Sequence, residues 1–551
     1  MPFPEVPSAL DARTQVFPVL TEAQIARIRD CGQTRKAEAG EILFEPNDSN
    51  VPFFVLLSGR MEIVLPQLDG ERLIAHHDPG EFTGEMTMIS GRQCLVRGQM
   101  IEAGELIELP NDTLRSLVAR DAEIGEILLR AFILRRLELI SHGFGNVILM
   151  GSRHSARTLE LREFLARNGH PYQYVDLDVD STSQELLDRF DVRPSEVPVV
   201  ICNNRIVLRS PSIAELANGL GFNANVNEKH VHDVIIVGAG PAGLAAAVYA
   251  ASEGLDALVI EARAPGGQAG SSSKIENYLG FPTGVSGQEL AARAVTQAQK
   301  FGADMIIARS VTELRCGNRP YEIVLDSGHP LLTRSVVIAT GAQYNKPQLP
   351  NLEQFEGNGI YYGATYIESQ LCLSGEVAVV GGGNSAGQAA VFLSQVAPRV
   401  HLLVRSGELR STMSRYLIQR LTENPQIKLH FNTEIIALNG TDSLASVFWR
   451  HKQTGDVSEH PIEHLFIMTG ASPRTDWLRD SLSLDSKGFV LTGRDLDEAN
   501  CTGDPRQMLE TSLPGVFAVG DVRAGNVKRV ASAVGEGAIS IHMVHRALAN
   551  L

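Results

Sequence analysis

Three different spacings of apolar and polar positions follow one another along the 551-residue chain. Between residues 10 and 140, a short helical stretch at 21–31 precedes strand-like runs such as 53–59 and 61–66, which Gly and Asp interrupt. The segment ends in an amphipathic run over 112–140. This order predicts a small antiparallel β-roll flanked by helices.

Residues 146–222 follow a second pattern, in which short strand-like and helix-like segments alternate. The polar stretch 223–232 that comes next is typical of a linker. The alternation predicts a compact α/β module. We expect its strands at 146–151, 171–178 and 197–204, and its helices at 156–169, 183–190 and 212–221.

From Asp233 onward, strands of Val and Ile alternate with Ala-rich helices and Gly-rich turns. This third pattern is typical of doubly wound nucleotide-binding sheets, and two Gly-rich turns indicate two of them. We expect one sheet to use residues 231–343 and 470–551, with the other inserted at 350–468. The fold class is therefore multidomain: a β-roll, an α/β module, and two Rossmann-like three-layer domains.

Composition narrows the choice of partners. The formal charge of −15 argues against nucleic acid, because phosphate binding requires a basic surface.

The N-terminus has no basic and apolar leader, and the most apolar long stretch, 234–251, contains Pro241. The six cysteines lie far apart and form no CxxC pair. We therefore expect a cytoplasmic protein with no membrane segment and no metal site.

The first Gly-rich turn, GAGPAG (238–243), joins a buried strand to a helix. Gly238 permits the tight turn, Gly240 lets the backbone approach a pyrophosphate, and Gly243 allows the helix to pack on the strand. Glu261 ends the next strand, eighteen residues after Gly243, where an acid binds a ribose hydroxyl. This combination predicts a dinucleotide site.

The second Gly-rich turn has Gly381, Gly383 and Ala386 in a GxGxxA pattern between a strand and a helix. The strand that follows carries Arg405, with Arg410 close by, in place of an acid. An acid would repel a 2′-phosphate, whereas arginine binds it through charged hydrogen bonds. The pattern therefore favours NADPH over NADH.

Five further segments follow the first turn and Glu261 in a specific order. Together they resemble the thioredoxin reductase family, the class II pyridine-nucleotide disulfide oxidoreductases, over residues 231–551. The resemblance implies a flavoprotein that forms homodimers and uses FAD and NADPH. The segments are APGGQAG (264–270), KIENYLGFP (274–282), VVIATGA (336–342), GVFAVGDVR (515–523) and NVKRVASAVGEG (526–537).

The same resemblance implies which residues bind each cofactor. For FAD they are Gly238, Gly240, Pro241, Ala242, Gly243, Glu261, Gly267, Gln268, Asn277, Thr340, Gly341, Gly520, Asp521, Arg529, Val530 and Ala531. For NADPH they are Gly381, Gly383, Asn384, Ser385, Ala386, Arg405 and Arg410.

The chain departs from this family at the redox cysteines, because Gly363 and Tyr366 occupy their positions. Without a vicinal dithiol, the internal disulfide relay cannot run. Cys372 has no partner close in sequence, and we interpret it as a buried structural thiol. No catalytic side chain is assigned. Electrons are expected to reach an external acceptor, which could be a protein disulfide, a quinone, a small redox protein such as ferredoxin, or oxygen.

Residues 146–222 resemble a glutaredoxin in the order of their elements, and Val197–Pro198 matches that fold's cis-proline strand. The turn where the thiols belong reads SRHS (152–155), with serines in their place. A hydroxyl cannot form a disulfide, so a docking or spacer role is expected.

Residues 10–140 resemble a cyclic-nucleotide-binding domain through FFVLLSG (53–59) and PGEFTGEM (79–86). The resemblance implies that Gly84 and Glu85 lie at the ligand, with Glu85 accepting from a ribose hydroxyl.

An arginine is expected about nine residues after Glu85, where that family binds the cyclic phosphate, yet Cys94 occupies this position. Arg92 and Arg97 are nearby but out of register. Three alternatives therefore stay open: a cyclic nucleotide, a different anionic ligand, or a structural role.

Two functions fit these features. The first is an enzyme that oxidises NADPH through FAD and reduces an external acceptor. The second is a redox sensor that binds flavin and nucleotide but turns over little, which the two added N-terminal modules would suit. Steady NADPH turnover with an added acceptor would distinguish them.

Overall fold

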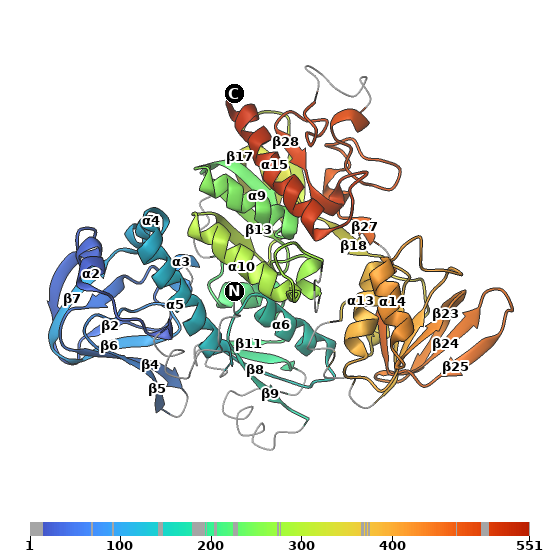
Figure 1. Ribbon diagram of the computed structural model, residues 1–551, viewed down its shortest axis with the longest axis horizontal. Helices are drawn as coiled ribbons and strands as arrows, with labels where there is room; N and C mark the ends of the chain where they lie inside the picture. Colours follow the sequence, from blue (N-terminus) through green and yellow to red (C-terminus); the bar gives the residue numbers. More distant parts are fainter. Residues whose placement is uncertain are drawn as a thin grey trace. The chain divides into compact units, whose positions relative to one another are not determined.

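The computed structural model describes residues 15–549 with short gaps, which are 68–69, 91–92, 142–146, 179–192, 194–195, 203–205, 224–229, 273–274, 276, 357, 365–368, 370–371, 373–374, 470 and 497–505. The chain forms two compact units (Figure 1). One comprises residues 1–151, 169–226 and 296–304, and the other comprises 152–168, 227–295 and 305–551. Within the described residues, no helix combines the length and apolarity needed to cross a membrane.

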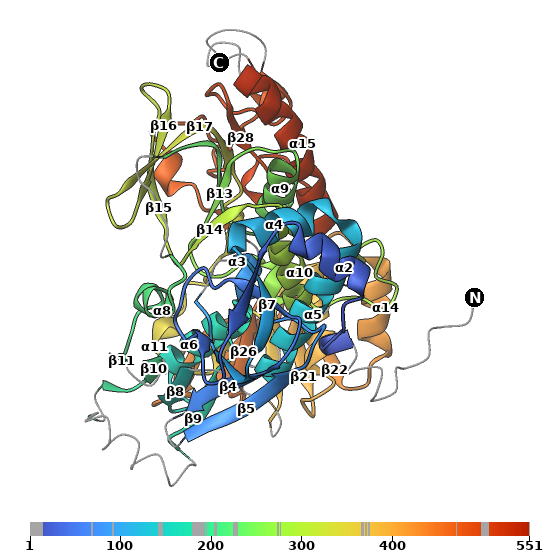
Figure 2. The ribbon, with the colours of Figure 1, turned by 90° about the vertical axis from the view of Figure 1, so that its left-hand side faces the viewer.

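The N-terminal roll is built from two small antiparallel sheets. One has the order β1-β7-β3, and the other has the order β2-β6-β4-β5. Figure 2 shows these strands and the helix α5 from another side. The strands are β1 (Gln33–Ala37), β2 (Ile42–Phe44), β3 (Phe53–Leu56), β4 (Arg60–Gln67), β5 (Gly70–His77), β6 (Arg97–Glu102) and β7 (Gly104–Leu109); the helices are α2 (Glu22–Arg29), α3 (Thr87–Ser90), α4 (Asn111–Arg120) and α5 (Ala122–Ser141).

An aromatic core holds the roll together. Phe53, Phe82 and Phe132 are almost completely buried, and their rings contact one another at centroid distances of 5.7 to 6.3 Å. Because Phe132 belongs to α5, this cluster fixes the helix against the sheets.

The amphipathic run over 112–140 forms two helices, and the break between them at Asp121 was not predicted. Asp121 separates α4 from α5 with an extended backbone, and its carboxylate accepts from the amide of Ile124 at 3.1 Å. The apolar spacing is continuous because both helices pack on the same core. A local side-chain cap therefore interrupts the run without changing its pattern.

A four-stranded mixed sheet follows the roll, with the order β11-β10-β8-β9. Its elements are β8 (Val147–Gly151), β9 (Gln173–Asp176), β10 (Val199–Cys202), β11 (Ile206–Arg209) and α8 (Ile213–Gly219). The strand β11 was not predicted, because this short edge strand is exposed at both ends and has no buried run. The helix expected at 183–190 lies outside the described residues.

The second unit contains α6 (Ala156–Arg167) and a seven-stranded sheet with the order β14-β13-β12-β17-β16-β15, in which β28 also pairs with β17. The strands are β12 (Val231–Val237), β13 (Ala257–Glu261), β14 (Asp304–Ile307), β15 (Val311–Arg315), β16 (Tyr321–Leu325), β17 (Pro330–Ile338) and β28 (Val516–Ala518). The expected linker at 223–232 is shorter than predicted, because β12 already begins at Val231.

Parallel pairing of β12 with β13 and β17 leaves their carboxyl ends at one edge of the sheet. The helices α9 (Pro241–Ser252) and α15 (Val530–Ala549) lie side by side, and α10 (Gly287–Lys300) completes this part (Figure 1). The strand β28 and the helix α15 come from the end of the chain. The seven-stranded sheet is therefore built from two chain segments, one before and one after the segment that forms a second sheet.

That second sheet is parallel, with the order β19-β26-β20-β21-β22. A separate antiparallel sheet, β23-β24-β25, was not anticipated. The elements are β19 (Ile360–Tyr361), β20 (Val377–Val380), α13 (Asn384–Leu393), β21 (Val400–Leu403), α14 (Arg415–Glu423), β22 (Ile427–His430), β23 (Thr433–Gly440), β24 (Leu444–His451), β25 (Val457–His460) and β26 (His464–Ile467); β18 (Ala342–Tyr344) pairs with β27 (Ala471–Pro473) where the chain passes between the two sheets.

Candidate functional site

The first Gly-rich turn follows β12 and leads into α9. Gly238 has a φ of 106°, and a Cβ there would lie 2.4 Å from the carbonyl oxygen of Ala339. A Cβ on Gly243 would lie 1.8 Å from the carbonyl oxygen of Gly238. Both glycines are therefore required by backbone contacts of the turn itself.

Gly240 differs from these two glycines because a Cβ there would meet only the Cα of Gly267, at 3.9 Å. It is the residue that precedes α9, and no side chain caps this helix end. Free amides and the positive end of the helix dipole favour an anion here. The open backbone at Gly240 is thus suited to a pyrophosphate.

Glu261 lies at the end of β13 and is held by the turn. Its Oε2 accepts from the amide of Ala239 at 2.8 Å, and its Oε1 accepts from the amide of Arg263 at 2.9 Å. Each carboxylate oxygen can accept a further bond, so the group can still receive a ribose hydroxyl. The predicted acid is therefore beside the predicted phosphate turn.

Other predicted flavin residues lie on the loops around this turn. Gly267 has a φ of 54° and approaches Gly240, while the Gln268 amide donates to the carbonyl oxygen of Ala342. Asn277 is exposed. The structure thus brings Gly267 to the phosphate turn.

Thr340 and Gly341 follow β17. The Thr340 hydroxyl donates to the carbonyl oxygen of Arg474 at 3.0 Å, and Gly341 has a φ of 66°. The hydrogen bond joins the two chain segments that lead to and from the second sheet.

The C-terminal motif returns to the first turn. Gly520 has a φ of 73°, a Cβ there would lie 3.0 Å from the Cβ of Ala242, and its amide donates to Glu536 at 2.8 Å. Burial raises the pKa of the neighbouring Asp521 carboxyl above its usual range. The side chain of Arg529 is exposed, and Val530 and Ala531 form the first turn of α15.

The second Gly-rich turn follows β20 and leads into α13. A Cβ on Gly381 would lie 2.4 Å from the carbonyl oxygen of Met468, whereas one on Gly383 would meet no atom within 4 Å. Ala386 is fully buried beneath the turn, and Asn384 accepts from the amide of Ser414 at 2.8 Å. Ser385 is exposed. Backbone atoms pack against the turn at Gly381, whereas the space beside Gly383 is free, as a phosphate site requires.

Arg405 and Arg410 follow β21, the strand next to this turn, and both are exposed. Within the described residues, neither guanidinium hydrogen-bonds to a carboxylate. Arg405 interacts at longer range with Glu434, whose pKa is held low mainly by a hydrogen bond from Arg450. Both arginines are therefore available to an anionic ligand.

The positions of the missing redox cysteines lie before β20. A Cβ on Gly363 would be 3.4 Å from the Cβ of Ser271, so this position faces the loop after Gln268. Tyr366 lies outside the described residues. Cys372 is fully buried, as expected of a structural thiol.

One group of side chains in the described chain could hold a metal ion, although no metal site was expected. Nitrogen atoms of His230 and His232 and a carboxylate oxygen of Asp256 lie within 4.8 Å of one another. Asp256 already pairs with both rings, at 2.5 Å and 3.2 Å. These contacts account for the cluster as an ion-pair group at the start of β12.

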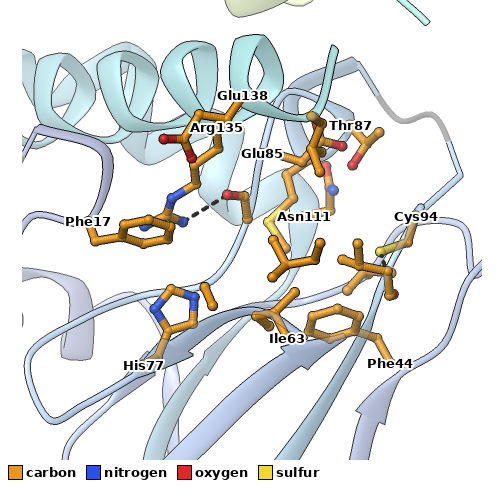
Figure 3. Close-up of a pocket in the computed structure, with 17 residues that line it drawn as sticks. Phe17, Phe44, Ile63, His77, Glu85, Thr87, Cys94, Asn111, Arg135 and Glu138 are labelled. Carbon is orange, nitrogen blue, oxygen red and sulfur yellow. Dashed lines mark hydrogen bonds between the residues drawn. The ribbon is translucent and has the colours of Figure 1, made fainter. Parts of the chain in front are cut away.

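The N-terminal roll contains a cavity, shown in Figure 3. Gly84 and Glu85 line it, and Glu85 forms an ion pair with Arg136 at 3.4 Å. Cys94 also lines the cavity, where its buried thiol donates to the carbonyl oxygen of Val96 at 3.2 Å. Arg97 pairs instead with Glu45 and Glu71, and Arg92 lies outside the described residues.

Arg135 is the cavity residue that the sequence analysis missed. It lies on α5, fifty residues after Glu85 in the sequence, and is only 7% exposed. Its place in an amphipathic run gave no sign that it points inward, since arginines on such helices usually face solvent.

Comparison with known proteins agrees with this geometry. A family model described as pyridine nucleotide-disulphide oxidoreductase matches residues 232–537, and one described as cyclic nucleotide-binding domain matches residues 34–121. Thioredoxin reductase of Treponema pallidum (strain Nichols) is 36% identical over 311 residues, which cover 56% of this chain and 95% of that protein.

Two further similarities cover the same part of the chain. NADPH-dependent thioredoxin reductase 3 of Arabidopsis thaliana is 34% identical over 325 residues, 58% of each protein. The crystal structure of Lactococcus lactis thioredoxin reductase (FR conformation) covers 58% of this chain and all of its own, with 28% identity and a TM-score of 0.53. The predicted redox core and N-terminal cyclic-nucleotide-binding-type domain are confirmed.

Proposed function

Because this chain belongs to the pyridine nucleotide-disulphide oxidoreductase family, we propose that it is an FAD-dependent enzyme that oxidises NADPH and reduces an acceptor outside its own chain. Thioredoxin reductases use FAD and NADPH. The observation that carries the proposal is the pair of strand–turn–helix sites, each closed by backbone contacts beneath and open above.

The first turn would hold FAD. Amides at the start of α9 face the pyrophosphate position, and Glu261 offers acceptors for the ribose. Asp521, at the C-terminal turn beside Ala242, would accept from the ribityl chain, with the start of α15 along the ring. Bound FAD supplies chemistry that side chains lack, since it takes up hydride from NADPH and releases electrons to an acceptor.

The second turn would hold NADPH, with its pyrophosphate at Gly383 and its 2′-phosphate at Arg405 and Arg410. The open space above Gly383 and the two exposed guanidinium groups support this assignment. Asn384 and Ser385 begin the helix that faces the phosphates. The protein's contribution to the reaction is to bind and orient the two nucleotides.

The absence of a redox cysteine pair from the sequence supports an electron acceptor outside the chain. The sequence has no CxxC pair, and Gly363 and Tyr366 stand where the family's pair would be. The acceptor classes are a protein disulfide, a quinone or a small redox protein. We propose that the homodimer is the working form, as in the family.

The four-stranded sheet at 146–222 is proposed to be a glutaredoxin-like domain without redox chemistry. Its β8, β9 and β10 have the parallel and antiparallel pairing expected of that fold, and the Val197–Pro198 peptide bond is cis. Ser152 and Ser155 lie at the turn before α6, where Ser155 caps the helix. A hydroxyl in that role stabilises a helix end but exchanges no disulfide. Docking of a partner is the proposed role.

We propose the domain limits 10–140, 146–222, 231–343 with 470–551, and 350–468. Hydrophobic clusters centred on the roll, the four-stranded sheet, the seven-stranded mixed sheet and the parallel sheet support these limits, and Leu159 of α6 belongs to the cluster of the parallel sheet.

The test is anaerobic mixing of the purified FAD-loaded protein with NADPH while flavin absorbance is followed. We expect rapid bleaching, much slower bleaching with NADH, and steady turnover once an acceptor such as a quinone is added. A flavin that stays oxidised in the presence of NADPH would contradict the proposal and would favour the redox-sensor alternative, in which the two N-terminal domains respond to ligand without turnover.

A further inference from the structure

The cavity in the N-terminal roll has a volume of about 250 Å³ and lies between α5 and the strands β4 and β5 (Figure 3). Apolar side chains form most of its wall. They are Phe17, Phe44, Val51, Ile63, Ile74, Ala75, Met88, Val96 and Leu139. A cavity of this size and lining is suited to a small, largely apolar molecule.

One end of the cavity carries an incompletely bonded cation. The Arg135 Nε donates to the carbonyl oxygen of Val16 at 2.9 Å, and its Nη1 donates to those of Phe82 and Gly84 at 3.0 Å and 2.8 Å. Its Nη2 is buried and has no hydrogen-bond partner. Two N–H donors therefore remain for a ligand.

The positive charge of Arg135 is not neutralised by a bonded carboxylate. All its hydrogen-bond acceptors are backbone carbonyls, and burial lowers the pKa of Arg135 to about 9, although Glu81, Glu138 and Glu85 oppose that change. Glu85 is paired with Arg136, and Glu138 is exposed. A buried, unpaired charge is costly, so an anion at Nη2 would be stabilised.

The opposite end of the cavity has no charge to offer. Burial raises the pKa of the Cys94 thiol to about 12, so the group is neutral, and it is bonded to Val96. In Figure 3, Phe44 and Ile63 lie on the strand side near Cys94, while Phe17, His77 and Arg135 lie at the other end. The cavity therefore has a cation at one end, while the other end is uncharged and mostly apolar, with Thr87 and Asn111 as its polar side chains.

We propose that this cavity binds a small amphipathic monocarboxylic acid, whose carboxylate accepts from Arg135 Nη2 and whose apolar body lies among Phe44, Ile63 and Val96. The proposal concerns the N-terminal domain alone and does not depend on the proposed redox function.

Two features argue against other anions. Glu85 and Glu138 also line the cavity, so a dianion would meet repulsion that a single charge on Arg135 cannot offset. A cyclic nucleotide also carries one charge, but its base and sugar bring several polar atoms to the mostly apolar half of the cavity, where Thr87 and Asn111 are the polar side chains.

The test is isothermal titration calorimetry on the full-length, FAD-loaded protein with octanoate, octanol and cyclic AMP. We expect octanoate to bind at least ten-fold more tightly than octanol, because only the acid reaches Arg135, and more tightly than cyclic AMP. Equal affinity for octanoate and octanol, no binding of octanoate, or tighter binding of cyclic AMP would each overturn the proposal.

Variants locate the site. Arg135→Met should reduce octanoate affinity at least ten-fold and leave octanol unchanged, while Arg130→Met, at an exposed position of the same helix, should change neither. Where Arg135→Met does not fold, Val96→Trp serves instead, because it fills the apolar end and should abolish octanoate binding. Retained octanoate affinity in folded Val96→Trp protein would contradict the proposal.

Discussion

The two Gly-rich turns share one backbone design and differ in the side chains that the next strand brings to them. In each turn, a glycine after the strand is required because a Cβ would lie 2.4 Å from a carbonyl oxygen of a neighbouring strand end. At the first turn Glu261 is bonded to the turn itself, while at the second Arg405 and Arg410 are exposed. We therefore propose that the backbone provides a general phosphate site and that the side chains select the nucleotide.

The strongest test of this comparison is Gly243→Ala. A Cβ there would lie 1.8 Å from the carbonyl oxygen of Gly238, so the turn must open. We expect a destabilisation of about 3 kcal/mol or more and loss of bound flavin, measured by thermal unfolding and by the ratio of flavin to protein absorbance.

Gly383→Ala is the contrasting variant from the second turn, where Gly383 is the counterpart of Gly240, since its Cβ meets no protein atom within 4 Å. It should keep stability and flavin content and should weaken only NADPH binding, because the methyl group occupies the pyrophosphate position. If both variants lost flavin equally, the difference between the turns would be refuted.

The choice of nucleotide is tested by the double variant Arg405→Gln with Arg410→Gln. One charged hydrogen bond contributes about 1.5–3 kcal/mol, so loss of even one such bond should lower the NADPH-over-NADH preference in kcat/KM by roughly 10- to 150-fold, and loss of two should lower it further. The KM for NADPH should account for most of the loss. Arg399→Gln, at the amino end of β21, should keep the preference; an unchanged preference in the double variant would remove these arginines from the site.

The variant Glu261→Gln tests the first Gly-rich turn in the same comparison. The amide oxygen can still accept from Ala239, but the charge that favours ribose hydroxyls is lost, so the FAD dissociation constant should rise about ten-fold, or ~1.4 kcal/mol. Fluorescence titration of the apoprotein with FAD measures it. Glu313→Gln on β15 provides the control, and equal FAD affinities in the two variants would contradict the assignment of Glu261.

The smallest expected effect is a pH dependence of the free energy of unfolding that originates at His430 in the parallel sheet β19-β26-β20-β21-β22. Burial, with the nearby charges of His401, Lys428 and His460, lowers the pKa of His430 to about 4. An unfolded chain protonates this histidine near pH 6.5, so it binds more protons than the native state, and stability should fall as pH drops from about 6.5 to 4.

Since His430 is partly exposed, solvent screening reduces this contribution to about 1 kcal/mol. His401 Nδ1 lies 2.9 Å from His430 Nε2, and His401 Nε2 lies 2.8 Å from a carboxylate oxygen of Glu376. Urea unfolding at pH 7 and pH 5, followed by Trp449 fluorescence in a Trp477→Phe background, should show a smaller pH effect in His430→Asn than in the parent. An identical pH effect would exclude His430 as its source.

The parts that sequence predicted well depend on neighbours along the chain. The turns at 238–243 and 381–386 are recognisable because tight backbone contacts admit only glycine or alanine at particular spacings. Glu261 and Arg405 were predicted to lie near the turns because each lies at or just after the end of the strand that pairs beside the turn's own strand. The residue types and spacings of these motifs therefore determine most of the backbone geometry of the turns.

The parts that sequence missed depend on contacts between distant segments. The break at Asp121 does not disturb the apolar spacing, and β11 has too few buried positions to stand out. Arg135 is separated from Glu85 by fifty residues, and only the packing of α5 on the roll turns its guanidinium inward. Helical periodicity alone would place such an arginine in solvent.

By itself, the sequence determined the two nucleotide-binding folds, the acid and the arginines that distinguish them, and the loss of the family's redox cysteine pair. These features are encoded locally, by residue type at fixed spacing. Only the tertiary structure decided that the N-terminal domain encloses a cavity with an unpaired buried guanidinium at one end and a neutral thiol at the other. Burial and hydrogen bonding between remote segments set those properties, and no local pattern records them.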